Sequence, residues 1–418
     1  MTPPRRWPDL GISAPVVIIG GGIAGLCVAI ALSRKGYSVI VAEKRADTVE
    51  SGAGLQLSPN ASHILMQWGL GPALARNAVA PTELAIRRWG EPRAYARMPM
   101  NSAKQGKGLA SDNQPFWVVL RADLHRALID MARREPLITI KAGWDLQQMR
   151  DDGAMVSLRF KGSPYDPEAG PRDIKALCVI GADGQRSVVR KLLGDARDLD
   201  RPGWEAWRTL IPADRTPDFI RAATTNLWLG RDSHAVHYPV AAGQLINLVI
   251  IKRGTGPDEG WNRKGDPAAL ADIRASAAPT LRDLMDQAPD WSVWTLLDRS
   301  PSHWLAKGVV ALAGDAAHPV LPFLAQGAAM AIEDAAVLGS LMPAAEHSGR
   351  ASIEKAFKAY AAQRSSRVHS VYKAARANAR NYHLLPLLAW FRDRRMAQLG
   401  PEGMRRRYNW LYDWRMPE

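Results

Sequence analysis

Short apolar runs and longer stretches of small and apolar residues alternate at the beginning of the chain. Residues 16–19 form a β-branched run, residues 23–34 form a longer apolar stretch, and residues 38–42 form a second run that ends at Glu43. A short apolar run bounded by turn residues is typical of a buried strand, and a longer stretch is typical of a helix. The order predicts a strand, a helix and a second strand, which is how an α/β protein opens.

Two different patterns follow in the rest of the chain. Buried runs and helical spacing are found at residues 121–133, 176–180, 309–313, 327–341 and 353–380. Strand-like runs are found instead at residues 227–229, 235–240 and 245–251, with a helical insert near 268–285. This change of pattern predicts a second domain built on a sheet. The tail at residues 384–414 is apolar, basic and rich in tryptophan, and we expect it to pack over the body of the protein.

The charge of the protein narrows its function only slightly. The 418 residues carry a formal net charge of +14, and their basic residues are scattered except for Arg405–Arg407. The sequence contains neither a recognition-helix pattern nor a zinc spacing nor a G-x-S-x-G motif. We therefore expect no nucleic-acid binding, no metal centre and no serine hydrolase. A basic surface is also suited to attracting an anionic substrate and a dinucleotide.

Cysteine usage and hydropathy favour a cytoplasmic protein. Cys27 and Cys178 both lie in apolar stretches, so we expect buried free thiols and a reducing compartment. The uncharged stretch Ile12–Leu32 could by hydropathy alone be a signal peptide or a membrane span. It contains four glycines, and an acidic residue follows the next apolar run, which favours a strand, a turn and a helix instead. We therefore expect no targeting segment and no membrane association.

A glycine-rich turn joins the first predicted strand to the first predicted helix. The residues Gly20-Gly21-Gly22-Ile23-Ala24-Gly25 fit the pattern G-x-G-x-x-G. Glycines there allow a tight turn, and backbone N–H groups at the helix N-terminus can then bind a pyrophosphate. An acid at the end of the second strand is placed to bind ribose hydroxyls. The predicted dinucleotide contacts are Gly20, Gly22, Ala24, Gly25, Glu43 and Lys44. The pattern alone does not distinguish FAD from a nicotinamide dinucleotide.

Several later segments, taken in order, resemble a known family. They include Gly52–Asn60, Leu120–Leu124, Gly181–Arg190, Glu205–Arg208, His237–Val240 and Gly314–Leu338. With the glycine-rich turn, they make the chain similar to the class A flavoprotein aromatic hydroxylases, and particularly to their salicylate hydroxylase-like group. The resemblance implies an α/β fold, with a Rossmann-like three-layer FAD-binding domain, an inserted mixed β-sheet substrate domain and a helical C-terminus, as in para-hydroxybenzoate hydroxylase. The FAD-binding domain would comprise residues 1–75, 110–195 and 300–345, the substrate domain residues 76–109 and 196–299, and the C-terminal segment residues 346–418.

The resemblance also assigns residues to the flavin end of FAD. Asp315 would accept a hydrogen bond from a ribityl hydroxyl, although an Asp in a glycine-rich turn can equally cap a helix. Gln326, Gly327 and Ala328 would begin a helix beneath the flavin ring. Free N–H groups at that position stabilise the negative charge of reduced flavin.

Other residues of the FAD set follow from the same resemblance. Arg121 would reach the pyrophosphate or the adenosine side, although an exposed helix arginine is also an ordinary surface residue. Asp183 belongs to a motif linked to FAD and to the nicotinamide coenzyme. The predicted set is completed by Gly54, Leu55 and Pro322.

The family chemistry needs two further reactants besides FAD. The resemblance implies that NADH or NADPH passes a hydride to FAD. Reduced FAD and O2 would then form a C4a-hydroperoxide, which donates one oxygen atom to an electron-rich ring. Only one dinucleotide fold is visible in the sequence, so the nicotinamide coenzyme would visit the flavin transiently. The expected substrate is a small phenolic acid similar to salicylate, and a homodimer is expected from the resemblance alone.

Three residues of the second domain are candidates for the reaction on the ring. His234 is the first candidate for the base that takes the phenolic proton, because its ordinary pKa suits that role near neutral pH. Tyr238 lies four residues later, so on a strand both side chains point to one face, and His237 points to the other. Tyr238 would orient the substrate, and Arg208 would bind a carboxylate through its planar fork. Each could also be an ordinary strand residue with a structural role.

Two places in the sequence bear on the identity of the substrate. Gln56 stands where some hydroxynicotinate-type relatives have a histidine, and Pro322 and Phe323 stand where some relatives carry polar substrate contacts. An apolar pocket roof favours a simple aromatic acid over a pyridine acid. Two alternatives stay open. One is a hydroxylase of a non-acid ring, such as urate or a secondary metabolite. The other is a flavin-binding protein whose basic tail, around Arg405–Arg407, binds nucleic acid or membrane.

Overall fold

The computed structural model describes residues 14–46, 53–101, 114–162, 171–254, 263–301 and 305–416. Gly52 and residues 12–13, which the sequence analysis used, lie outside these ranges. A six-stranded sheet forms the centre of the nucleotide-binding part, in the order β18-β19-β11-β1-β2-β7. All its neighbours are parallel except β18, and the bounds are β1 (Val16–Ile19), β2 (Val39–Glu43), β7 (Ile138–Ala142), β11 (Cys178–Gly181), β18 (Ala306–Lys307) and β19 (Val310–Leu312).

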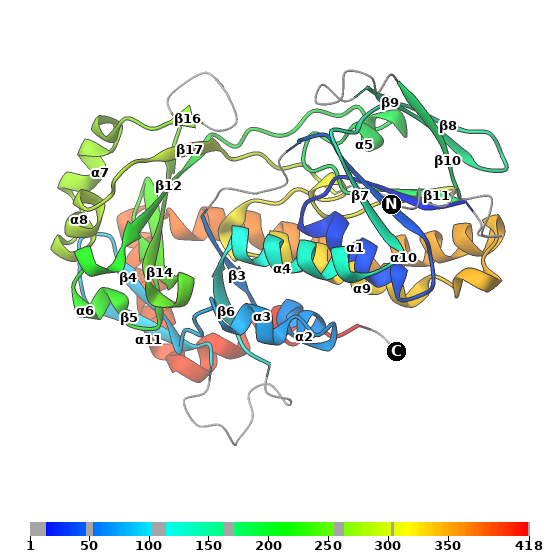
Figure 1. The fold of residues 1–418 in the computed structure, drawn as a ribbon. Coiled ribbons are helices and arrows are strands. Elements are labelled where there is room, and N and C mark those ends of the chain that lie inside the picture. Colours follow the sequence, from blue (N-terminus) through cyan, green and yellow to red (C-terminus); the bar gives the residue numbers. More distant parts are fainter. Residues whose placement is uncertain are drawn as a thin grey trace.

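Helices lie on one side of this sheet and a smaller sheet lies on the other (Figure 1). The helices are α1 (Ile23–Ser33), α4 (Arg121–Arg134) and α9 (Gly327–Leu341), with α10 (Arg350–Tyr382) packed against α9. Ten of the eleven residues of α1 are buried, because α4 and α9 both pack against it. The smaller sheet is antiparallel, with the bounds β8 (Asp145–Asp151), β9 (Val156–Lys161) and β10 (Arg172–Ala176). The predicted α/β class and three-layer arrangement are confirmed.

One predicted strand is divided between two sheets. The apolar run at residues 176–180 predicts a single strand, but Ala176 ends β10 and Cys178 begins β11. Leu177 forms a bend between them, where its backbone N–H donates to the carbonyl of Pro15 at 2.9 Å. The single-strand prediction is wrong because both strands face the same hydrophobic core, so the run stays apolar through the bend.

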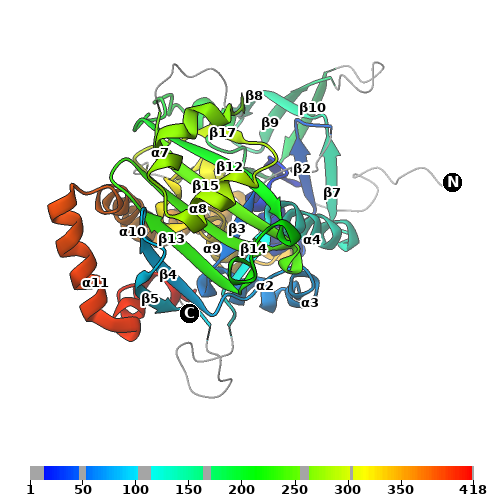
Figure 2. The same ribbon diagram turned by 90° about the vertical axis from the view of Figure 1, so that its left-hand side faces the viewer.

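An eight-stranded mixed sheet forms the second part of the fold, in the order β16-β17-β12-β15-β14-β13-β4-β5. Only β13 and β4 are parallel neighbours, and the bounds are β4 (Glu83–Arg88), β5 (Ala94–Pro99), β12 (Trp204–Pro212), β13 (Thr224–Leu229), β14 (Ser233–Val240), β15 (Leu245–Arg253), β16 (Arg263–Lys264) and β17 (Ser292–Thr295). The short helices α7 (Ala271–Ala275) and α8 (Pro279–Asp286) lie across one face of it (Figure 2). The inserted mixed sheet is confirmed, and its boundaries at residues 76–109 and 196–299 remain a proposal.

A two-stranded ribbon connects the two parts of the fold. It consists of β3 (Gly54–Leu57) and β6 (Trp117–Leu120), and β3 leads into α2 (Pro59–Gln67) and α3 (Gly71–Ala75). The backbone N–H of Gly54 donates to Oδ1 of Asn247 on β15 at 2.7 Å. A Cβ atom at Gly54 would lie 2.8 Å from Cε2 of Tyr238, so this close approach requires glycine. The ribbon therefore holds one face of the eight-stranded sheet, the face that carries Tyr238 and Asn247, against the nucleotide-binding part.

The C-terminal tail forms α11 (Pro386–Arg406) and α12 (Asn409–Tyr412), and α11 stands at the edge of the molecule against β5 (Figure 2). Large apolar side chains at its beginning are exposed, namely Leu385, Leu387, Leu388, Trp390 and Phe391. The tail packs on the body as predicted, because α11 lies along β5 and Met404, Leu411 and Tyr412 belong to the main core, but the beginning of α11 leaves these five side chains exposed. Among the described residues, no helix is both long and apolar enough to cross a membrane.

Candidate active site

The glycine-rich turn lies among β1, β2 and β11. Gly20 has a φ of +108°, and a Cβ atom there would lie 2.4 Å from the carbonyl oxygen of Ala182. A Cβ atom at Gly25 would lie 1.9 Å from the carbonyl oxygen of Gly20, so α1 can approach β1 this closely only through glycine. The buried carboxylate of Glu43 accepts a hydrogen bond from the backbone N–H of Gly21 at 2.8 Å. The structure thus brings the end of β2 to the predicted pyrophosphate turn.

Two other elements close around this turn. Gly22 is the N-cap of α1, and a Cβ atom on Gly314 would lie 2.8 Å from the Cβ of Ala24. His125 of α4, which sequence reasoning missed, donates from Nε2 to the carbonyl oxygen of Gly21 at 2.8 Å, because that oxygen can only accept. No local motif marks His125, since its partner lies 104 residues away in the sequence.

Asp315 and Arg121 are brought together although they lie far apart in the sequence. Asp315 lies in the turn after β19, and Arg121 is the first residue of α4. Burial raises the pKa of the Asp315 carboxyl, and the positive charge of Arg121 is the strongest of the effects that oppose it. A carboxylate accepts from hydroxyl groups and a guanidinium binds phosphate, so the pair can hold both ends of a ribityl pyrophosphate.

Asp183 caps a helix in this structure. Its carboxylate accepts hydrogen bonds from the Ser187 hydroxyl at 2.5 Å and from the first N–H group of α5 (Val188–Leu192) at 2.7 Å. In α5, the buried Arg190 donates from Nε to the carbonyl oxygen of Ala316 at 2.8 Å. The Asp183 motif therefore supports the turn after β19. Its direct contact with FAD or with the coenzyme remains a prediction.

The N-terminus of α9 is open. The side chain of Gln326 accepts from Nδ2 of Asn60 at 3.0 Å and donates to Oγ of Ser58 at 2.8 Å, which ties it to the beginning of α2. The first N–H groups of a helix have no partner within the helix. A Cβ atom at Gly327 would meet no other atom within 4 Å, so there is space beside these N–H groups. A negatively charged group can be stabilised in that space.

A buried ionic cluster fixes α9 from behind. Glu333 and Asp334 of α9 are fully buried, and Arg364 of α10 binds each carboxylate at 2.7 Å. Arg367 binds Glu333 at 2.8 Å, and Asp334 also accepts from the backbone N–H of Gly314 at 2.8 Å. The cluster joins α9, α10 and the turn after β19 into one unit. Both acids lie in the segment Gly314–Leu338 on which the family resemblance rests, whereas sequence reasoning missed both arginines, since α10 contains many other basic residues.

These features fit an FAD molecule. The glycine-rich turn suits the pyrophosphate, the open N-terminus of α9 suits the flavin, and the carboxylate between them suits the ribityl chain. Pro322 begins the short turn that leads into α9. Lys44 is exposed just beyond β2, and Leu55 is half-buried on β3. The roles of these three residues remain predictions.

Three predicted residues share the face of the eight-stranded sheet that is turned away from α7 and α8. His234 and Tyr238 are on β14, and Arg208 is on β12, with β15 between the two strands. In the strand register, Arg208 is level with Val236, which lies midway between His234 and Tyr238. Four residues of a strand span about 14 Å. The histidine and the tyrosine therefore mark two ends of a site, with the arginine beside its middle.

Within the part of the chain that the structure describes, Arg208 has a buried donor without a partner. Burial lowers the pKa of its guanidinium, which lies over the ring of Trp294, 5.2 Å from the centroid. Its buried Nε atom makes no hydrogen bond within the described residues, and neither does the buried Nδ2 of Asn247 on the neighbouring strand. Because an unpaired buried donor is costly, two of them indicate a place for an acceptor such as a carboxylate. Sequence reasoning missed Asn247, which belongs to no motif.

His234 is buried in an aromatic enclosure. Its ring centroid lies 5.2 Å from that of Phe323 and 5.3 Å from that of Tyr382. Its Nδ1 lies 3.0 Å from Nε2 of His383, which follows α10 and was missed by sequence reasoning. Burial lowers the pKa of His234 well below its ordinary value, and His383 lowers it further. The imidazole of His234 is therefore neutral at physiological pH.

His237 lies outside this site. Its ring stacks on that of Trp228 at 6.1 Å, in the part of the core that α8 covers. Burial lowers the pKa of His237 to about 3, and neither of its nitrogens has a hydrogen-bond partner within the described residues. The structure thus separates the two histidines of β14, as the alternation of side chains along a strand requires.

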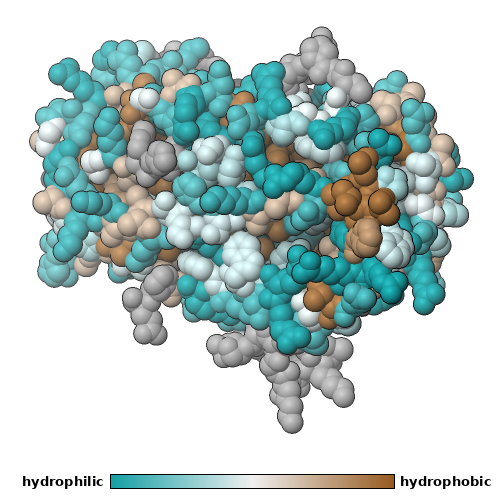
Figure 3. Space-filling view, turned by 180° about the vertical axis from the view of Figure 1, so that it is seen from behind, coloured by the Kyte–Doolittle hydropathy of each residue, from teal (hydrophilic) through white to brown (hydrophobic). Residues whose placement is uncertain are grey.

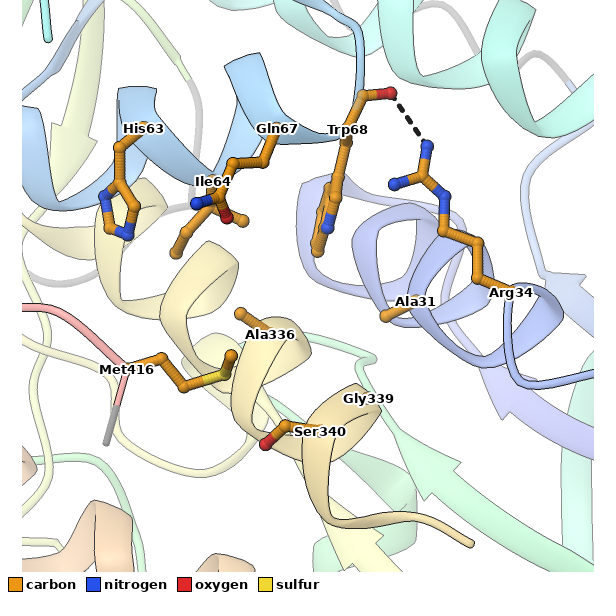
Figure 4. A pocket seen from close by; sticks show the side chains of 10 residues that line it. All are labelled: Ala31, Arg34, His63, Ile64, Gln67, Trp68, Ala336, Gly339, Ser340 and Met416. Atoms are coloured by element: carbon orange, nitrogen blue, oxygen red, sulfur yellow. Dashed lines mark hydrogen bonds between the residues drawn. The ribbon is translucent and has the colours of Figure 1, made fainter. Parts of the chain in front are cut away.

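A separate pocket lies between α1, α2 and α9 (Figure 4). At its edge, Arg34 donates to the carbonyl oxygen of Trp68 at 2.7 Å, and Met416 of the tail closes another side. None of the predicted cofactor or catalytic residues lines it. This pocket is therefore not the candidate active site.

The basic cluster of the tail is smaller than the sequence suggested. Arg405 is buried, and its guanidinium binds Asp413 at 2.8 Å and Asn409 at 2.6 Å. Arg405 consequently stabilises the junction of α11 and α12 and does not belong to an exposed basic surface. The hypothesis of a nucleic-acid- or membrane-binding tail loses part of its only support.

Comparisons with known proteins show the family to which the chain belongs. A family model described as FAD binding domain matches residues 13–375. The chain is 30% identical over 402 residues to 3-hydroxybenzoate 6-hydroxylase from Polaromonas naphthalenivorans (strain CJ2), with 96% of each chain covered. It is 34% identical over 371 residues to 3-amino-4-hydroxybenzoate 2-monooxygenase PtnB3 from Streptomyces platensis, with 88% of each chain covered. A solved salicylate hydroxylase substrate complex has a TM-score of 0.78 at 22% identity, covering 97% of this chain and 96% of that one.

Proposed function

The chain belongs to the FAD binding domain family and is an FAD-dependent aromatic monooxygenase, and from this premise we propose that its substrate is a small phenolic acid. The observation that carries the choice of an acid is the buried Nε of Arg208, which has no hydrogen-bond partner within the described residues. A substrate carboxylate would satisfy it. Two of the relatives described above are named for such an acid. They are 3-hydroxybenzoate 6-hydroxylase and 3-amino-4-hydroxybenzoate 2-monooxygenase.

Each residue of the site has a distinct task in this proposal. Arg208 binds the carboxylate beside the middle of the site, and Asn247, which is level with Tyr238 on the neighbouring strand, donates to it from the Tyr238 end. Burial raises the pKa of Tyr238, so its hydroxyl remains protonated and orients the substrate as a donor. His234 takes the phenolic proton, which makes the ring more electron-rich. The aromatic enclosure around His234 excludes water from the reacting ring.

The cofactor would be held by the residues of the nucleotide-binding part. Glu43 and the glycine-rich turn would bind the adenosine ribose and the pyrophosphate, Arg121 and Asp315 the ribityl pyrophosphate, and the N-terminus of α9 the flavin ring. When bound, FAD accepts a hydride from NADH or NADPH and uses O2 to supply the oxygen atom that is added to the substrate. The single dinucleotide-binding turn leaves the nicotinamide coenzyme as a transient visitor.

The first test is a substrate panel on the purified, FAD-loaded protein. Oxidation of NADH and NADPH would be followed together with O2 uptake, in the presence of 3-hydroxybenzoate, salicylate, 6-hydroxynicotinate or urate. We expect a phenolic acid to stimulate oxidation and to give a hydroxylated product. Stimulation by urate alone would replace the acid with a non-acid ring. Stimulation by none of the four would reject 3-hydroxybenzoate and salicylate as substrates and leave the choice of a small phenolic acid without support.

We further propose that the protein is a homodimer through α11. The beginning of this helix exposes several large apolar side chains, and Leu387 and Phe391 are 69% and 57% exposed. A hydrophobic patch is also visible on the back of the molecule, on the side where α11 lies (Figure 3). Monomeric proteins rarely expose such patches, and the interfaces of homodimers are more apolar than other interfaces. Two copies of α11 related by a twofold axis would cover one another.

A further inference from the structure

A second histidine reaches the enclosure around His234 from the end of α10. The proposed function requires His234 to take a phenolic proton, and this requires a ring nitrogen that carries no hydrogen. In a neutral imidazole, one nitrogen carries a hydrogen and the other does not. The hydrogen bond of one nitrogen decides the state of the other. The hydrogen-bond partner of His383 therefore determines which ring nitrogen of His234 carries the hydrogen.

A backbone carbonyl fixes the hydrogen on His383. Its Nδ1 lies 2.7 Å from the carbonyl oxygen of Ala379, which can only accept, so Nδ1 carries the hydrogen. Burial lowers the pKa of His383 to about 4, and at physiological pH its Nε2 therefore has a free lone pair. That Nε2 lies 3.0 Å from Nδ1 of His234. Nδ1 of His234 must then donate, and its Nε2 is left as the acceptor.

Stacking holds His383 in this orientation. Its ring stacks on that of Trp204, with centroids 4.2 Å apart and planes 27° apart. The guanidinium of Arg253 lies over the same tryptophan ring, 3.9 Å from its centroid. Trp204 is on β12 and Arg253 is on β15, so the end of α10 is fixed to the sheet that also carries His234.

Burial is the main cause that keeps both imidazoles neutral, and the charged groups around the pair have smaller effects. Besides burial, Arg253 of β15 and Arg392 of α11 lower the pKa of His383, while its bond to Ala379 and the charge of Asp232 raise it. Tyr382 of α10 faces His234, and burial raises the pKa of this tyrosine well above its ordinary value. The tyrosine is therefore uncharged as well. A neutral pair is the state that the tautomer argument requires.

We propose that His383 is a positioning residue of the hydroxylation site, which accepts the Nδ1 hydrogen bond of His234 and so keeps Nε2 of His234 free for the phenolic proton. In that step the phenol O–H bond breaks and an N–H bond forms at Nε2. The substrate becomes a phenolate and His234 an imidazolium, whose Nδ1–H stays bound to His383. The proton returns to the product oxygen after oxygen transfer. The role of His234 as base rests on the proposed function, whereas its tautomer does not.

Two variants of His383 separate positioning from a merely structural role. His383→Phe keeps a ring to stack on Trp204 but removes the acceptor, and His383→Gln places an amide oxygen near the position of Nε2. Imidazole ¹⁵N chemical shifts of the FAD-loaded, histidine-labelled protein show which nitrogen carries hydrogen. The chain has nine histidines, and His234→Gln identifies the signals of His234. Flavin absorbance and thermal unfolding report whether each variant is folded.

We expect His234 to carry its hydrogen on Nδ1 in the wild type and in His383→Gln, and to lose this preference in His383→Phe. The kcat for the stimulating phenolic acid should fall about 10-fold in His383→Phe with little change in KM, and should largely recover in His383→Gln. An Nε2–H tautomer in the wild type, or an Nδ1–H tautomer that persists in His383→Phe, would overturn the proposal. If the tautomer behaves as expected but His234→Gln hydroxylates at the wild-type rate, the base has been misassigned and the tautomer assignment stands.

Discussion

Arg208 allows the carboxylate site to be tested at the scale of one residue. Arg208→Met should raise the KM for the acid substrate about 10- to 100-fold, because a hydrogen bond to a charged group contributes about 1.5–3 kcal/mol. For the corresponding phenol without a carboxylate, the same substitution should change KM little. Steady-state kinetics with both compounds give the comparison.

Arg159→Met, which removes an exposed arginine of β9 far from this face, serves as the control. It should leave both KM values unchanged. If Arg208→Met weakens the binding of acid and phenol equally, the guanidinium holds the shape of the site and does not bind the carboxylate.

The burial of His237 predicts how the free energy of unfolding depends on pH. Its ordinary pKa of 6.5 is lowered by burial to about 3 in the folded protein. Above pH 6.5 the folded and unfolded states are both neutral at His237. Below that pH, the unfolded chain gains a proton that the folded chain does not, so the free energy of unfolding falls until about pH 3. At pH 5 the loss amounts to about 2 kcal/mol.

His237→Phe should remove this part of the pH dependence and also the two unpaired buried nitrogens. Urea unfolding at pH 8 and pH 5 would show a difference between the two pH values that is about 2 kcal/mol smaller than in the wild type. The exposed His347, replaced by Phe, is the control. An unchanged difference in His237→Phe would mean that His237 is protonated in the folded protein.

Residues of the site differ in how far the sequence could reveal them. Glu43 and Asp315 stand at fixed places in local motifs, beside turns whose glycines are themselves visible in the sequence. His383 acts only through His234, from which it is 149 residues distant, and no local pattern distinguishes it from an ordinary helix-end histidine. Asn247 likewise becomes informative only when its unpaired nitrogen is seen on the same sheet face as Arg208, level with Tyr238.

At the scale of elements, the ion pairs between α9 and α10 can be tested by removing Arg364. Arg364→Met should lower the free energy of unfolding by about 3–5 kcal/mol, because it leaves buried carboxylates without their partner. It should also weaken FAD binding, since Glu333 and Asp334 fix the helix whose N-terminus we propose as the binding place of the flavin ring. Urea unfolding and titration of the apoprotein with FAD measure the two effects.

Arg350→Met on the same helix is a matched control, because Arg350 binds the exposed Asp151 at 2.6 Å outside the buried cluster. Its effect on FAD binding should be negligible. Equal losses in the two variants would mean that α10 supports the fold as a whole and does not specifically support the flavin site.

Among the elements, those with a continuous buried face were the most predictable from the sequence. The strand at residues 16–19 and the helix at 327–341 were predicted with the bounds that the structure gives. Other elements pack against them on several sides, so apolar residues continue along their whole length. The run at 176–180 failed for the same reason, since its bend is buried too. The exposure of the beginning of α11 was not foreseen, because an apolar sequence does not tell whether its partner lies within the chain.

At the scale of the whole molecule, the exposed face of α11 predicts an oligomeric state. The wild type should elute and scatter light as a dimer, and the double variant Leu387→Glu, Phe391→Glu should be a monomer with an unchanged flavin spectrum. A charge on each side of the twofold axis would be buried without a partner. Met66→Glu, at an exposed position of α2, is the control. A wild type that is monomeric at every concentration rules the interface out.

The buried cluster behind α9 also has a consequence for the order in which the protein is made. Glu333 leaves the ribosome 31 residues before Arg364, which neutralises it, and hundreds of residues after the glycine-rich turn. Until that arginine arrives, a few seconds later at about 5–20 residues per second, α9 cannot be seated without burying unpaired carboxylates. We therefore expect flavin to be captured late in synthesis. A nascent chain that ends before residue 364 would carry the complete dinucleotide motif and should nevertheless fail to retain the cofactor.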